Sequence, residues 1–317
     1  MTEIHFPGTL DFGRRIVATI PKNGDGIDQL FLKFVLPQLP YGLLYKDCCV
    51  YDLIDELTLE IGGKKIIELN SRSLRLFDTL KRNINDIKIC SKIIDNTVIY
   101  PFDLKYFFGK SKTDNAAQLG DNFEGVRLVD LNYHETRLYL KIGNIIDLIN
   151  IQYVKPNTNQ LLGGLSLVGV TIIGHYDNFA TKPNAKITQS TCSLYYDNVD
   201  MDSNDAKSEL THTFPKFNNE TKIALHSHML NDVKSFVIQL NGVDCIKENM
   251  KIYKKMYDYN NNTNLGVNTF IISLTPKLND IITLRLVFSQ PLSKFNMSYA
   301  FLVNSDSVYQ SGKFNKN

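Results

Sequence analysis

His226 and His228 form the closest histidine pair in the chain, and a histidine is the side chain most often found binding metal ions. On a β-strand, alternation would place both rings on the same face, where both could bind one metal ion. An enzyme site built on this pair would also need a nearby Glu and a later His. The chain offers only Asp232 nearby, and no histidine follows His228. We therefore expect a polar turn here and no metal site.

Two other short motifs could in principle do chemistry. His134 and Glu135 could act as a general acid and base, but this needs a cleft and a partner, so we expect a hydrogen-bonding pair at a strand end. Gly24 and Gly26, in KNGDG, could cradle a phosphate, but neither a helix nor the Lys-Ser/Thr of a P-loop follows them. We interpret KNGDG as a turn.

Four tyrosines with neighbouring Arg or Lys residues could stack on nucleic-acid bases, although interior or subunit-contact positions are the simpler expectation: Tyr133, Tyr139, Tyr195 and Tyr196. The chain has 35 basic and 33 acidic residues, a net charge of +2. A protein that coats nucleic acid needs a larger basic surplus, so we expect no sequence-specific nucleic-acid binding.

A small basic cluster and five cysteines complete the set of reactive side chains. Lys251, Lys254 and Lys255 are typical of a solvated face. The cysteines form no C-x-x-C pair, which argues against zinc and favours reduced thiols: Cys48, Cys49, Cys90, Cys192 and Cys245. No Ser, Cys or carboxylate arrangement supports a nucleophilic mechanism. The prediction is a protein without catalytic, cofactor-binding or metal-binding residues, and not an enzyme.

The element that best organises the chain is a β-hairpin over Asp55–Leu69. Leu57, Leu59 and Ile61 alternate with polar residues, and Gly62-Gly63 supplies the positive φ angles of a tight turn. A short helix is expected directly afterwards, over Ser71–Asn83, where apolar residues have helical spacing.

Short strands separated by turn signals fill the rest of the 317 residues. This pattern predicts an all-β protein of jelly-roll sandwiches, with the helix inserted in the first. A polar stretch near residue 186 predicts two domains, 1–186 and 187–317. A faint repeat supports two tandem copies of one fold, because LTLEIGGKKI at 57–66 resembles FVIQLNGVDCI at 236–246. We expect no signal peptide and no membrane-spanning segment.

Several stretches together resemble the major capsid proteins of nucleo-cytoplasmic large DNA viruses, which fold as double jelly rolls. The stretches, in the order of the family, are Ile20–Pro37, Leu53–Ile66, Val98–Ser111, Val126–Ile142, His226–Leu240 and Asn296–Phe314. The chain departs from the family pattern at Phe236, where a Trp is usual, and in its short loops. A related smaller double jelly-roll capsid protein therefore also fits.

The resemblance implies a structural virion protein: a homotrimer of pseudo-hexagonal outline that tiles an icosahedral capsid, meets other capsid proteins, and assembles in the host cytoplasm. It also gives the lysine cluster a use, as a contact with an inner membrane or with other virion components. Three alternatives stay open at this stage: a carbohydrate- or receptor-binding virion component, a capsid-like assembly scaffold, and a cupin-like metalloenzyme that uses His226 and His228.

Overall fold

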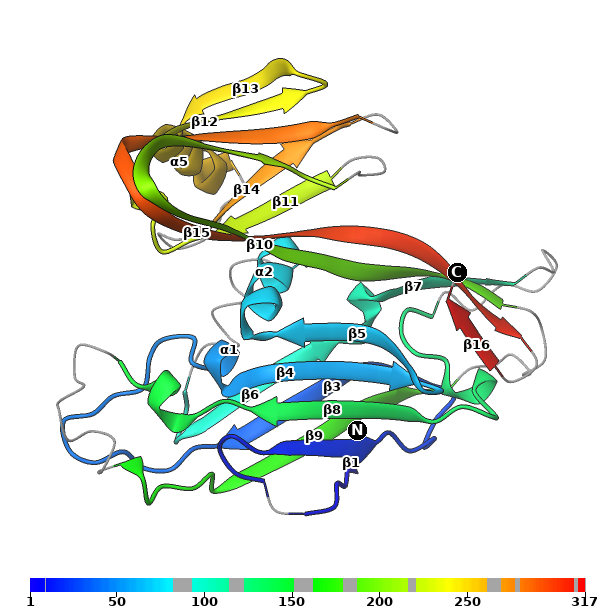
Figure 1. The fold of residues 1–317 in the computed structure, drawn as a ribbon. Helices are drawn as coiled ribbons and strands as arrows, with labels where there is room; N and C mark the ends of the chain where they lie inside the picture. The colour runs from blue at the N-terminus through cyan, green and yellow to red at the C-terminus, as the bar shows by residue number, and fades with distance from the viewer. Residues whose placement is uncertain are drawn as a thin grey trace. The chain divides into compact units, whose positions relative to one another are not determined.

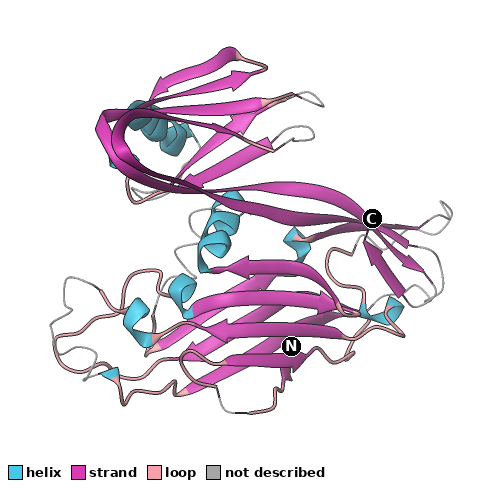
Figure 2. Ribbon diagram, in the orientation of Figure 1, coloured by secondary structure: helices cyan, strands magenta, loops and turns pink. Residues whose placement is uncertain are grey.

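The computed structural model describes residues 1–8, 10–81, 93–113, 123–150, 162–178, 187–215, 221–260, 269–276, 280–310 and 313–316. Strands dominate these residues, with few helices (Figure 2). The chain separates into two compact units. Unit 1 comprises Met1–Leu74, Lys88–Ser193 and Asn304–Asn317, and unit 2 comprises Arg75–Ile87 and Leu194–Val303.

Unit 1 contains two antiparallel four-stranded sheets (Figure 1). The first has the order β1 (Thr2–Ile4), β9 (Gly169–Asp177), β3 (Gly26–Val35), β6 (Thr97–Asp103). The second has the order β2 (Arg15–Thr19), β8 (Thr136–Ile142), β4 (Ile54–Ile61), β5 (Lys64–Asn70). Numbered along the chain without β7 (Phe108–Thr113), the eight strands have the order 1-8-3-6 and 2-7-4-5, which is a jelly roll.

Unit 2 has the same topology, but two long strands each serve both of its sheets. The strands are β10 (Ile187–Thr213), β11 (Thr221–His226), β12 (Val233–Leu240), β13 (Val243–Asn249), β14 (Thr269–Leu274) and β15 (Ile282–Gln310). β15 pairs with β12 through its first residues and with β11 through Ser298–Phe301. Figure 1 shows β10 and β15 curving together from one sheet to the other. With each counted as two strands, the order is again 1-8-3-6 and 2-7-4-5.

A hairpin followed by a helix occurs once in each unit, at the same spacing. β4, β5 and α2 (Ser71–Lys81) run from residue 54 to 81, and β12, β13 and α5 (Met250–Asn260) run from 233 to 260 without insertion or deletion. Both turns have two residues with positive φ, Gly62-Gly63 and Asn241-Gly242, as a type I′ turn requires. The strand register also shifts at the equivalent position, after Leu59 and after Ile238.

The two helices start with the same cap. The Asn70 side-chain oxygen accepts a hydrogen bond from the Ser73 N–H (2.9 Å), and that of Asn249 accepts one from the Lys251 N–H (3.0 Å). An Asn at this position binds N–H groups of the first turn that have no partner within the helix. The faint sequence repeat therefore reflects a real structural repeat.

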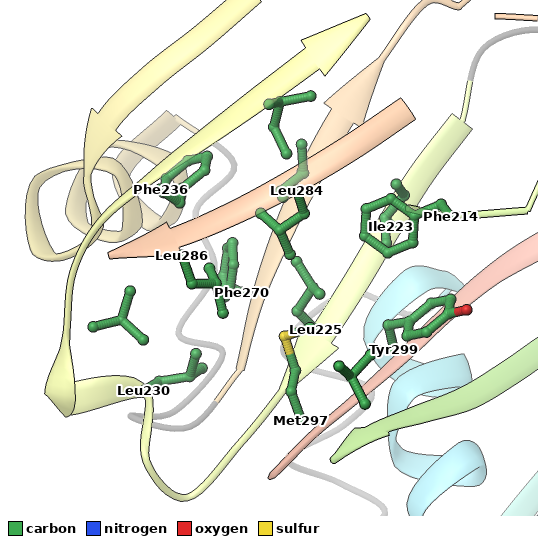
Figure 3. Packing of buried hydrophobic residues seen from close by; sticks show 14 of the residues in the cluster. Phe214, Ile223, Leu225, Leu230, Phe236, Phe270, Leu284, Leu286, Met297 and Tyr299 are labelled. Atoms are coloured by element: carbon green, nitrogen blue, oxygen red, sulfur yellow. The ribbon is translucent and has the colours of Figure 1, made fainter. Parts of the chain in front are cut away.

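Each sandwich has an apolar core. In unit 2, side chains from both sheets interdigitate, among them Phe236, Phe270, Leu284 and Tyr299 (Figure 3). In unit 1, strand residues such as Leu32 on β3 and Leu138 on β8 are fully buried. Burial of apolar surface on this scale is the main stabilising term of such sandwiches. The other elements in the described residues are α1 (Val50–Leu53), four short 3-10 turns and β16 (Lys313–Lys316), which pairs with β15.

The structure confirms the all-β double jelly roll and the hairpin. It corrects the expectation of a single inserted helix, because α5 is a second one. The units are also not contiguous, since their boundary lies within α2, β10 and β15. The division at residue 186 stays a prediction. Among the described helices, none is long and apolar enough to cross a membrane.

Candidate functional site

One group of side chains in the described residues could hold a metal ion by distance alone. It consists of Asp28 on β3 and of His175 and Asp177 on β9, whose ligand atoms all lie within 4.8 Å of one another. His175 Nδ1 and Asp28 Oδ1 already pair at 2.7 Å, and both side chains are partly exposed. Such ion pairs are common on protein surfaces without a metal, and nothing further marks this group as a site.

The KNGDG turn packs beside this group. The Asp25 N–H donates to the Asp177 carbonyl (2.9 Å), and a Cβ on Gly24 would lie 3.0 Å from the Cβ of Tyr176. Gly24 is thus explained by close packing against β9. The turn that the sequence predicts explains this motif without a phosphate.

His134 and Glu135 point to different partners. The imidazole of His134 accepts a hydrogen bond from the Phe314 N–H at 3.3 Å and lies against Gly62, where a Cβ would come within 2.6 Å of the ring. Glu135 forms an exposed ion pair with Arg137 (2.7 Å). His134 thus packs against the first hairpin turn, while Glu135 pairs with Arg137 of β8.

His226 and His228 do not share a strand face, because β11 ends at His226. The Nδ1 of His226 lies 2.9 Å from the hydroxyl of Thr269, and the two imidazole rings meet edge to face with centroids 5.2 Å apart. In the part of the chain that the structure describes, neither joins two further metal-ligating side chains. Asp232 lies in a separate 3-10 turn, Leu230–Asp232.

Three of the four tyrosines have partners within their own unit. Tyr139 lies under the Arg15 guanidinium (5.8 Å to the ring centroid), Tyr195 stacks on Phe301 (4.7 Å), and the Tyr196 hydroxyl binds Asn198. Tyr133 is 75% exposed. None of the four is buried, so the expected interior position is not confirmed, and a role in subunit contacts stays a prediction.

The cysteines that the structure describes are free thiols: Cys48, Cys49, Cys192 and Cys245. Cys90 lies outside the described residues. Burial, with a smaller effect of the Asp52 charge, raises the pKa of the Cys49 thiol to about 12. A thiol with so high a pKa is a poor nucleophile at neutral pH.

A buried ion pair in unit 1 is a feature that sequence reasoning missed. The Arg127 guanidinium and the Asp130 carboxylate meet at 2.6 Å, and the side chains are only 2% and 7% exposed. The i, i+3 spacing around a short 3-10 turn is the signal that could have revealed it. Its burial points to a structural role.

Exposed side chains on two regular elements are further candidates for a functional surface. Lys251, Lys254 and Lys255 lie on α5, with Lys251 and Lys255 exposed. Two apolar residues of the same helix, Ile252 and Met256, are 55% and 56% exposed. In unit 1, Ile99 on β6 is 45% exposed. Ile252 and Met256 are four residues apart and are therefore neighbours on the surface of α5.

Comparisons with known proteins agree with this picture. A family model for the N-terminus of major capsid proteins matches residues 1–202. Capsid protein 1 of Acanthamoeba polyphaga mimivirus is 25% identical over 171 residues, and the major capsid protein of Paramecium bursaria Chlorella virus 1 is 24% identical over 191. These matches span 44% and 57% of this chain but only 27% and 40% of the relatives.

The fold has close counterparts among solved structures. The PBCV-1 virus capsid model superimposes with a TM-score of 0.74 at 15% identity and covers 99% of this chain and 95% of that one. The major capsid protein of STIV superimposes with a TM-score of 0.53 at 11% identity, covering 92% of both chains. Both likenesses concern the fold. The family match covers most of the chain and shows that this chain belongs to the major capsid protein family.

Proposed function

We propose that this protein is the structural subunit of a viral shell, a major capsid protein that acts by assembly and not by catalysis. The observation that carries the proposal is the family match over residues 1–202, on a chain that folds throughout as two jelly rolls. A near-neutral net charge of +2 suits a subunit that must pack against copies of itself.

The subunit forms homotrimers in this proposal. Each copy supplies two sandwiches of one topology, so three copies place six similar sandwiches in a ring of pseudo-hexagonal outline. Such rings tile an icosahedral shell in the virion, next to other capsid proteins, after assembly in the host cytoplasm. Rings arise when one surface of each copy binds a different surface of the next and the rotation closes.

Light scattering after size-exclusion chromatography, followed by negative-stain microscopy, tests this proposal on the purified full chain. The expected result is a species of three chains with a hexagonal outline. A chain that stays monomeric up to high micromolar concentration would overturn the proposal. A monomer that binds a glycan on a glycan array would instead favour the carbohydrate-binding alternative.

A further inference from the structure

The two equivalent helices differ in what covers them, and this difference locates a contact between copies. α2 begins in unit 1, and its residues from Arg75 onward are part of unit 2. There Leu76 packs with Ala224 on β11, Ile271 on β14 and Ala300 on β15. One face of unit 2 is therefore closed by the helix that follows the first hairpin.

This face is the outer side of a jelly-roll sheet. Ile223 and Leu225 point into the sandwich core, so Ala224 between them points away from it. Ala224 pairs with Ile271 on one side and with Ala300 on the other, which makes a continuous row across three strands. All three side chains are at most 3% exposed.

The corresponding face of unit 1 is more exposed than this face of unit 2. Its strands in the same topological places are β3, β6 and β9, and the matching row is Phe31, paired with Pro101 and with Ile173. These three side chains are partly exposed, and Ile99 beside them is 45% exposed. Glu3 on β1, opposite Ile173, adds an exposed carboxylate.

α5 is exposed at the positions where α2 is buried. Ser73, Leu76 and Phe77 of α2 are at most 2% exposed, whereas the residues at the same positions in α5 are Ile252, Lys255 and Met256, all exposed. Their i, i+3, i+4 spacing places them on one side of the helix. The opposite side holds α5 in place, since Tyr253 packs edge to face on Phe236 with ring centroids 5.0 Å apart.

We propose that α5 of one copy covers the outer β3–β6–β9 face of the next copy, as α2 covers the equivalent face within the chain. The occupant is a second copy of this chain because it carries the helix that matches the covered repeat. Lys255 would then meet the carboxylate of Glu3. This inference rests on the proposed self-assembly and assigns residues to it.

Two substitutions on α5, Ile252→Asp and Met256→Asp together, test the contact on the full chain. We expect the concentration needed for trimer formation to rise by about 30-fold or more, as for loss of central interface residues. The matched control is Val243→Asp with Ile281→Asp, two equally exposed apolar residues of unit 2 outside the helix (67% and 53%). The control should assemble like the unmodified chain, and unchanged thermal unfolding should show that both variants fold.

Mixing provides the second readout. Ile99→Asp places a charge on the β3–β6–β9 face and should also prevent trimer formation. A mixture of this variant with the α5 variant can form one intact contact. The Ile99→Asp variant supplies an unmodified α5, and the α5 variant supplies an unmodified β3–β6–β9 face. We expect a dimer in the mixture and none in either variant alone.

The outcomes separate the two proposals. An unmodified chain that never assembles overturns the proposed function. If the unmodified chain forms trimers and the α5 variant assembles equally well, only the proposed α5 contact is overturned. The same holds if the control variant loses assembly to the same extent as the α5 variant. A mixture without dimer also overturns it.

Discussion

The first hairpin with α2 and the second hairpin with α5 have the same lengths, turn type, register shift and Asn cap, yet the two helices differ in burial. Phe77 of α2 is 1% exposed, and Met256 at the same position of α5 is 56% exposed. The turn, the helix start and the strands depend on local sequence: residues that tolerate positive φ, an Asn cap, and alternating apolar and polar residues. Burial is set by what packs against the module, and it shows which copy of the repeat still has a free surface.

The largest expected effect separates the two helices by burial. Phe77→Ala should lower the free energy of unfolding by about 3–5 kcal/mol, because it leaves a cavity in a packed region. Met256→Ala should change it by less than about 0.5 kcal/mol in the unassembled chain. Denaturant unfolding at low protein concentration measures both. Equal losses would contradict the difference in burial.

The two turns provide the next test. Gly62→Asn keeps a residue that tolerates positive φ but places a Cβ 2.6 Å from the His134 ring, so we expect a loss of about 1–3 kcal/mol. Adding His134→Ala should remove most of that loss.

The reverse exchange, Asn241→Gly, meets no such ring. It removes two hydrogen bonds, to Asp280 and from the Ile281 N–H, and should cost about 1 kcal/mol. A Gly62→Asn variant whose loss persists without His134 would show that strain in the turn itself is responsible.

The caps should behave alike in both units. Asn70→Ala and Asn249→Ala each remove an acceptor from a helix start, and each should lower stability by about 1 kcal/mol. Ser at either position should restore most of it. If only one helix responds to the loss of its cap in thermal unfolding, the caps are not equivalent.

The smallest expected effect is a pH dependence confined to unit 2. Burial lowers the pKa of His212, whose ring lies beside Phe214 and Tyr299 at 5.1 and 5.0 Å. The folded state thus favours the neutral ring, and this stability is present above pH 6.5 and declines as the pH falls below it. His212→Gln should reduce the fall in melting temperature between pH 8 and pH 5.5. An unchanged fall in melting temperature would mean that groups other than His212 cause it.

The sequence predicted the fold class and the first hairpin because alternation and Gly-Gly are local signals. It did not predict α5, because Lys251, Lys254 and Lys255 suggested only a solvated face, although Asn249 stands where Asn70 does. The full length of β10 was also hidden, since its residues 200–213 are mostly polar and lack alternation.

Groups of side chains that come together only through strand pairing could not be predicted from the sequence. Asp28 and His175 are 147 residues apart and meet only because β3 pairs with β9. The exposed side of α5 was equally hidden, because Ile252 and Met256 have the spacing of ordinary core residues. Only comparison with the buried α2 shows that they lack a cover.

A cryo-EM reconstruction of the purified assembly tests the central claim most directly, that two copies of one jelly roll per chain build a closed ring. We predict three chains with six equivalent sandwiches and α5 density on the β3–β6–β9 face of the neighbouring copy. A monomer, or a ring whose chains join through other surfaces, would contradict the claim.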